Sequence, residues 1–347
     1  MTRDGTGGVT LDDVARRAGV SLATASRALN GGSRRVSAEL EERVLRAAQE
    51  LRYVPNAQAQ ALASARTRTV GMIVRDVADP YFAEIAAGAL TVADASERLM
   101  LLCNTYHDRA RELEYVSLLR AQQVGGLIFA GSGFDDRDFS RKMAAQVEAF
   151  AARNGHPVLI GRHHVPGDCV LPDNLGGARA LARAIVELGH TRIGVISGPE
   201  AVTSVVDRMS GIEEVLRERG SPLAPGAVVG GDFTREAGFT AAHKLLERAP
   251  DLTAILALND AMAVGALAAL RERGIAVPGD VSLAGFDDVP STRDVTPALT
   301  TVRVELRRLG AEAMKLALEP QQADIRLVHV PTEVILREST AAPRRRA

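Results

Sequence analysis

The spacing of apolar residues predicts two kinds of architecture along this chain of 347 residues. From residue 68 onward, short apolar runs such as TVGMIV, LMLLC and VGGLIFAG alternate with longer segments of helical periodicity. Such alternation predicts parallel sheets covered by helices. The rhythm runs to the strand PVLIG and restarts after a loop, which predicts two similar α/β lobes.

Before residue 68 the pattern predicts helices only. Thr10 is a good N-cap for a first helix, with Asp13 at its third position and Gly19 as a left-handed terminator. A second helix spans Leu22–Leu29, and Ser37 begins a third with an acidic first turn. Two helices joined by a tight glycine-containing turn and braced by a third form a helix-turn-helix unit.

Charge adds a local argument. The chain has a net charge of −1, but its first 66 residues hold ten arginines and no lysine against seven acidic residues. The second helix offers the hydroxyls of Ser21, Thr24 and Ser26 near its N-terminus, and Arg27 can form a fork to guanine or phosphate. These features favour nucleic-acid binding, although a three-helix protein-interaction module has the same pattern.

Polar and aromatic residues follow the predicted strands of both lobes, where ligands bind in open α/β sheets. Aromatic faces stack on sugar rings, and Arg, Asn and Asp pair with hydroxyls, so a small polyhydroxylated ligand is expected. Two of these residues, Asp260 and Asp288, also suit a helix cap or the edge of the cleft. The full set is Asp76, Asp79, Tyr81, Phe82, Gly198, Pro199, Arg208, Asp232, Phe233, Asn259, Asp260, Asp287 and Asp288.

The N-terminal strings VTLDDVARRAGVSLATASRALNG and VSAELEERVLRAAQELRYVPNAQAQALAS resemble the DNA-binding domain of the lactose-repressor (LacI/GalR) family of bacterial transcription regulators. The resemblance implies that the second helix enters the major groove of double-stranded DNA. Leu22 and Ala23 can make only apolar contacts there, so Arg27 carries most of the hydrogen-bonded readout. The implied DNA-binding residues in this region are Thr10, Leu11, Ser21, Leu22, Ala23, Thr24, Ser26, Arg27 and Asn30.

The segment YVPNAQAQALAS has two interpretations. By itself it is an alanine-rich linker, in which Asn56 caps a short helix and Leu62 docks on a domain surface. The family resemblance instead implies a hinge helix that forms on operator DNA, pairs with its dimer mate and wedges Leu62 into the minor groove. Asn56 and Gln60 are then DNA-binding residues as well.

The remainder, about 68–339, resembles the effector-binding core of the same family, itself similar to periplasmic sugar-binding proteins. The strings that carry this resemblance include DPYFAEI, RIGVISGP, AILALNDAMAVGAL and VPGDVSLAGFDDVP. Val202 and Val304 depart from purine-binding and lactose-type members, so a sugar of unspecified kind is the expected effector. The implied effector contacts are Tyr81, Phe82, Arg208, Phe233, Asn259 and Asp287.

The expected fold class is an all-α helix-turn-helix domain followed by two parallel-sheet lobes of the periplasmic-binding-protein type. The domains are 1–54 for DNA binding, 55–67 for the hinge, 68–340 for the core and 341–347 for a basic tail. Lobe one is expected at 68–167 with 302–324, and lobe two at 168–301 with 325–339. The helix ELRRLGAEAMKLALE has an apolar face that ordinary core packing explains. The family resemblance adds a dimer contact, and one helix can serve both roles.

The expected function is a transcriptional regulator, a repressor that binds a palindromic operator as a homodimer under control of a small molecule. The alternative is a sugar-binding transport receptor, but the N-terminus MTRDGTGGVT has no apolar signal core, so a cytoplasmic location is expected. The sequence has no glycine-rich phosphate-binding loop and no nucleophile-elbow spacing, so an enzyme is not expected. Cys103, Cys169 and the adjacent pair His163 and His164 lack metal-ligand spacing, so no cofactor or metal is expected.

Overall fold

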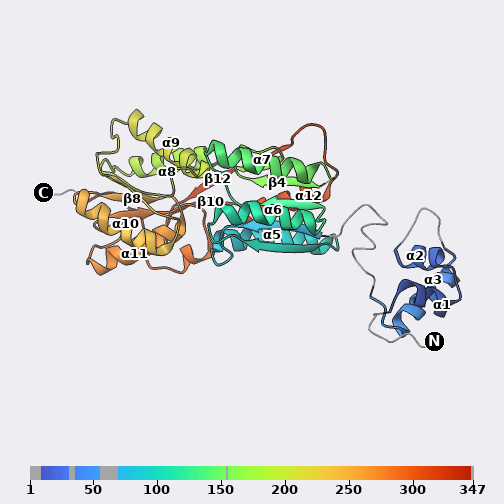
Figure 1. Cartoon of the computed structure of the whole chain (residues 1–347). Coiled ribbons are helices and arrows are strands. Elements are labelled where there is room, and N and C mark those ends of the chain that lie inside the picture. Colours follow the sequence, from blue (N-terminus) through green and yellow to red (C-terminus); the bar gives the residue numbers. More distant parts are fainter. Residues whose placement is uncertain (1–8, 31–35, 55–68, 154, 345–347) are drawn as a thin grey trace. The chain divides into compact units, whose positions relative to one another are not determined.

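The structure is a computed structural model that describes residues 9–30, 36–54, 69–153 and 155–344. The chain divides into two compact units, Met1–Arg68 and Thr69–Ala347, which are described separately below (Figure 1). In the described part of the chain, no helix is both long enough and apolar enough to cross a membrane.

Three helices form the N-terminal unit: α1 (Leu11–Ala18), α2 (Leu22–Asn30) and α3 (Ala38–Glu50). Thr10 and Asp13 form a capping box that starts α1, and Gly19 ends this helix with a φ of 65°. Small residues let the helices approach closely around Val14 and Val44, which are fully buried. The expected helix-turn-helix is therefore confirmed, although the Ser37 side chain makes no capping bond to α3.

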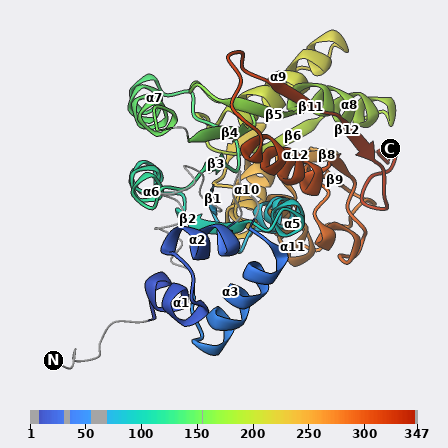
Figure 2. The same cartoon turned by 90° about the vertical axis from the view of Figure 1, so that its right-hand side faces the viewer.

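A six-stranded sheet forms the first lobe, in the order β11-β5-β4-β3-β1-β2, and every pairing in it is parallel. Figure 2 shows α6 and α7 on one face of this sheet and α5 and α12 on the other. The elements are β1 (Thr69–Val74), α5 (Pro80–Ala95), β2 (Leu99–Asn104), α6 (Arg109–Ala121), β3 (Gly126–Phe129), α7 (Arg137–Ala151), β4 (His156–Ile160), β5 (Asp168–Pro172), α12 (Leu306–Leu318) and β11 (Leu327–Val330).

Helix α12 corresponds to the segment ELRRLGAEAMKLALE, and its apolar face is buried within this lobe. Leu309 and Ala313 are fully buried, and α12 crosses α5 so closely that a Cβ on Gly310 would lie 1.8 Å from the carbonyl oxygen of Ile85. Core packing thus accounts for this face in the single chain.

The second lobe is a four-stranded parallel sheet in the order β7-β6-β8-β9. In Figure 1, α8 and α9 cover one face of it and α10 and α11 the other. Its elements are α8 (Asn174–Glu187), β6 (Ile193–Ser197), α9 (Thr203–Glu218), β7 (Val228–Gly230), α10 (Arg235–Arg248), β8 (Ala254–Ala257), α11 (Asp260–Glu272) and β9 (Ser282–Ala284). Because both sheets are parallel and covered by helices, the predicted architecture is confirmed.

The expected division of the core into lobes was wrong at two places. Residues 168–172 and 327–330 were assigned to lobe two, but β5 and β11 extend the sheet of the first lobe beyond β4. No helix separates β4 from β5. The alternation restarts at α8, as the sequence predicts, so the lobe boundary drawn at residue 168 was too early. A two-stranded antiparallel sheet of β10 (Thr301–Val304) and β12 (Thr332–Ile335) completes the core after a 3-10 turn at Pro290–Arg293.

Candidate functional site

The N-terminal half of α2 presents an exposed surface. Ser21, Leu22 and Ala23 are all exposed, and half of the Leu22 surface is accessible. The Ser21 hydroxyl accepts a hydrogen bond from the Thr24 amide at 3.2 Å and also lies 2.8 Å from the Thr24 hydroxyl. These bonds satisfy polar groups at the start of α2 from within the chain, while its first residues stay exposed.

Arg27 lies one turn further along α2. Its Nε donates to the Ala23 carbonyl at 3.0 Å, so the guanidinium is held beside the exposed start of the helix. On the buried side of the unit, Ala25 packs against the other helices, and Arg43 donates to the Ala18 carbonyl at 2.6 Å. The apolar spacing of this helix predicts that Leu22, Ala25 and Leu29 share its buried face. Ala25 is buried and Leu29 half-buried there, but Leu22 is exposed, so the prediction was wrong for Leu22.

Other expected DNA contacts have different surroundings. Thr10 is exposed at the start of α1, where its hydroxyl donates to Asp13 at 2.7 Å, and Leu11 is half-buried. Three hinge residues, Asn56, Gln60 and Leu62, lie outside the described residues. So does the Asn30 side chain, although its backbone ends α2.

In the core, Arg208 of α9 is the centre of the candidate effector site. Its guanidinium donates to Asn174 Oδ1 at 2.9 Å, to the Leu258 carbonyl at 2.5 Å and to Asp287 Oδ1 at 2.8 Å. The guanidinium carbon also lies 3.7 Å from the centroid of the Phe286 ring. These contacts fix a buried cation at the ends of β8 and β9, as Arg geometry favours.

Asp287 is held as firmly as its partner. Its amide donates to Val302 and its carbonyl accepts from Val304, so β10 fixes the backbone at a φ of 117°. Burial raises the pKa of Asp287 to about 7, against the lowering effect of Arg208.

Two aromatic residues come from the first turn of α5 in the first lobe. The Tyr81 and Phe82 rings meet edge to face with centroids 5.0 Å apart. Phe82 is buried against Gly131, whereas Tyr81 is half-buried. Burial and, to a smaller extent, the negative charge of Asp287 raise the pKa of Tyr81.

Asn259 and Phe233 are joined in the second lobe, because Asn259 Nδ2 donates to the Phe233 carbonyl at 3.0 Å. Asn259 also caps α11 by accepting from the Met262 amide at 2.9 Å. The Phe233 ring packs over Gly198, and its backbone has a φ of 72°. Phe233, Asn259 and Asp287 thus follow strands, whereas the other three expected effector residues lie on helices α5 and α9. The Asn259 side chain is already engaged by the protein.

The expected capping role of Asp260 and Asp288 is not what the structure shows. Asp260 is buried and accepts from the Thr301 hydroxyl at 2.6 Å and the Val289 amide at 2.9 Å, because Asn259 is the actual cap of α11. Asp288 is also buried, and it pairs with three arginines: Arg293, Arg303 and Arg337. Both carboxylates brace the crossing strands.

Sequence reasoning missed a second arginine at the edge of the first-lobe sheet. Arg75 follows β1 directly, is half-buried and donates to the Ser132 carbonyl. Close by, His163 Nε2 contacts the Gly131 carbonyl at 2.8 Å, and burial lowers the pKa of His163 to about 4. The strand-end rule would have identified Arg75, since it precedes Asp76 in the same loop.

Contacts between the lobes flank this site. The Thr203 amide donates to Gly133, and the Asp135 amide donates to Ala201. An ion pair of 2.7 Å joins Arg162 of the first lobe to Asp207 of α9. Val202, which the sequence singled out, is buried here and bridges Phe134.

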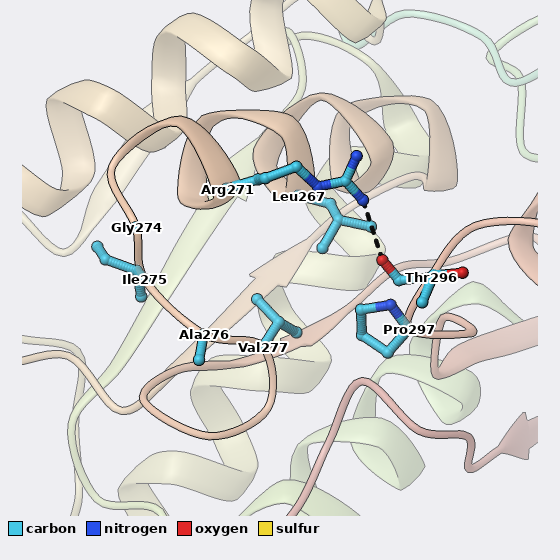
Figure 3. Close-up of a pocket in the computed structure, with 8 residues that line it drawn as sticks. All are labelled: Leu267, Arg271, Gly274, Ile275, Ala276, Val277, Thr296 and Pro297. Carbon is cyan, nitrogen blue, oxygen red and sulfur yellow. Dashed lines mark hydrogen bonds between the residues drawn. The ribbon is translucent and has the colours of Figure 1, made fainter.

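A separate hollow of about 290 Å³ lies at the far end of α11 (Figure 3). Apolar side chains line most of it, and Arg271 donates to the Thr296 carbonyl at 3.1 Å across one side. It contains none of the expected site residues, and within the described residues no cluster of His, Cys, Asp or Glu has metal-binding geometry.

Known sequence families match both parts of the chain. The family described as bacterial regulatory proteins, lacI family, matches residues 10–56. The family described as periplasmic binding protein-like domain matches residues 182–340. The HTH-type transcriptional regulator GalS of Salmonella typhimurium strain LT2 is 36% identical over 344 residues, which cover 98% of both chains.

Solved structures match over nearly the whole length too. The lac repressor dimer bound to operator and the anti-inducer ONPF has a TM-score of 0.83 at 29% identity, covering 97% of this chain and 100% of that one. The transcriptional regulator CelR in its complex with cellobiose has a TM-score of 0.70 at 31% identity, covering 95% of this chain and 99% of that one. These relatives are regulators of transcription, not enzymes.

Proposed function

The chain belongs to the lacI family of bacterial regulatory proteins and is a DNA-binding transcriptional regulator, and from this premise we propose that it is a repressor controlled by a small molecule. A homodimer binds a palindromic operator, with α2 in the major groove and the hinge segment containing Leu62 in the minor groove. The solved lac repressor dimer bound to operator supports this assembly.

The effector is a sugar or sugar derivative that binds between the lobes. The observation that carries this proposal is the buried pair of Arg208 and Asp287, with Tyr81 of the other lobe in electrostatic reach. The hydroxyls of such a ligand can form hydrogen bonds with the Arg208 guanidinium and the Asp287 carboxylate. Phe82 and Phe233 supply apolar surface for the sugar ring. The complex of CelR with cellobiose supports a carbohydrate.

Control follows from linkage. A ligand that contacts both lobes favours one lobe arrangement, and DNA binding must change ligand affinity by the same factor. The contacts of Thr203 with Gly133 and of Arg162 with Asp207 are those that a lobe movement would break or form.

The test is selection of DNA from a random duplex library by the full-length protein, followed by titration of neutral and acidic sugars into the bound complex. We expect a two-fold symmetric site whose affinity changes at least tenfold with one sugar. Failure to enrich any symmetric site at low salt contradicts the proposal, since electrostatic attraction is then strongest.

A further inference from the structure

Arg75 is a half-buried cation without an ion-pair partner. Its guanidinium donates to the Ser132 carbonyl and lies 4.7 Å from the centroid of the Phe134 ring. No carboxylate in the described part of the chain comes within ion-pair distance of it. Charged groups removed from water are normally paired, so this arrangement is incomplete by itself.

A second arginine that contacts the same ring shows the contrast. The guanidinium carbon of Arg109 lies 4.0 Å from the Phe134 centroid, but Arg109 also pairs with Asp136 at 3.0 Å. Glu112 acts on Arg75 electrostatically without forming an ion pair in the described structure. Burial raises the pKa of Glu112, which weakens its ability to balance that cation.

The other carboxylates near the cleft are already engaged. Asp287 pairs with Arg208 at 2.8 Å. Asp79 accepts the Tyr81 amide at 2.9 Å as the cap of α5, and burial raises its pKa. Both of these acids therefore have a donor inside the protein, whereas Arg75 contacts only a carbonyl and a ring among the residues that the structure describes.

Arg75 also lies at the candidate effector site. It holds Ser132, whose neighbour Gly131 packs against the Phe82 ring and accepts from His163. The positive charges of Arg208 and Arg75 both lower the pKa of Tyr81, against the larger effect of burial.

We propose that the effector carries an oxyanion, a carboxylate or a phosphate, that pairs with Arg75 while its hydroxyls meet Arg208 and Asp287. The effector class is an acidic sugar: a uronate, an aldonate or a sugar phosphate. This inference rests on the proposed function, since it concerns the same site. The planar guanidinium of arginine can bind a carboxylate or a phosphate through two parallel hydrogen bonds. Either oxyanion would supply the negative counter-charge that Arg75 lacks.

Thermal unfolding of the full-length protein at constant ionic strength tests the inference. The probes are galactose with galacturonate, and glucose with gluconate and glucose 6-phosphate, so that charge and its chemistry vary separately. We expect at least one anion to raise the unfolding temperature more than its neutral parent does. Arg75→Gln should weaken binding of that anion about 10- to 100-fold, and Arg75→Lys should weaken it less.

Arg109→Gln is the matched control, because it removes a paired cation from the same ring. This variant should retain the preference for the anion. Without ligand, Arg75→Gln should unfold at the wild-type temperature or above, because glutamine keeps a donor for Ser132 and removes an unbalanced charge. A bracing role for Arg75 predicts a lower temperature instead.

The inference is overturned if no anion stabilises the protein more than its neutral parent, or if Arg75→Gln keeps the preference. Stabilisation by a neutral sugar that also changes operator affinity would leave the regulatory function standing and refute only the acidic effector. Loss of symmetric-site selection refutes the regulatory function, whichever sugar binds.

Discussion

Arg208 and Asp287, 79 residues apart in the chain, form a 2.8 Å ion pair in which each side chain is only 5% exposed. The arginine comes from α9, and the aspartate lies at the junction with β10. This pair therefore couples α9, which carries part of the candidate effector site, to a strand that runs between the lobes.

Removal of Asp287 should have two separable effects. Asp287→Ala leaves Arg208 buried without its counter-charge, so we expect a loss of about 3–5 kcal/mol in unfolding free energy. Asp287→Asn keeps an acceptor for Arg208 and should destabilise less, yet it should still abolish the response of operator affinity to the effector. Urea unfolding and DNA-binding titrations check both; a normal effector response in either variant would remove Asp287 from the site.

Arg27 should determine base preference more than affinity. Arg27→Ala should cost about 1–3 kcal/mol at the preferred operator and relax selection at one base pair of each half-site. Arg17→Ala is the control, because Arg17 pairs with Glu50 within the N-terminal unit. Selection of DNA by each variant gives the measurement, and unchanged base preference in Arg27→Ala would show that another residue reads this position.

Leu62 should act on DNA and not on the effector. Leu62→Ala removes most of the apolar wedge, so specific operator affinity should fall while effector affinity stays at the wild-type value. Fluorescence anisotropy with operator DNA and calorimetry with the effector separate these two outcomes. Equal operator affinity in variant and wild type would favour the linker interpretation of this segment.

The sequence was sufficient to predict the architecture wherever strands and helices alternate regularly. Alternation predicted both parallel sheets and their covering helices. That the polar residues after the strands form one ligand site stays a prediction. The assignment of β5 failed because no helix separates it from β4, so periodicity gave no boundary. Similarly, sequence alone could not show that Asp136 pairs with Arg109 and leaves Arg75 alone, since that depends on three-dimensional packing.

His163 should make the core less stable in acid. Its pKa falls from the usual 6.5 to about 4, chiefly because burial disfavours the charged imidazole. A base with a lowered folded-state pKa contributes its full stability above the unfolded pKa. That contribution is lost as pH falls from about 6.5 through about 4, up to about 3 kcal/mol.

His163→Gln cannot gain this proton, so its urea unfolding free energy should fall less steeply than that of the wild type between pH 7 and pH 4. Glutamine can still donate to the Gly131 carbonyl, so the comparison isolates the charge. His164→Gln is the control, since it makes the same substitution at the neighbouring position, where the side chain is 43% exposed. If His163→Gln and the wild type lost stability in parallel over this range, His163 would be protonated in the folded core, and carboxylates alone would account for its acid sensitivity.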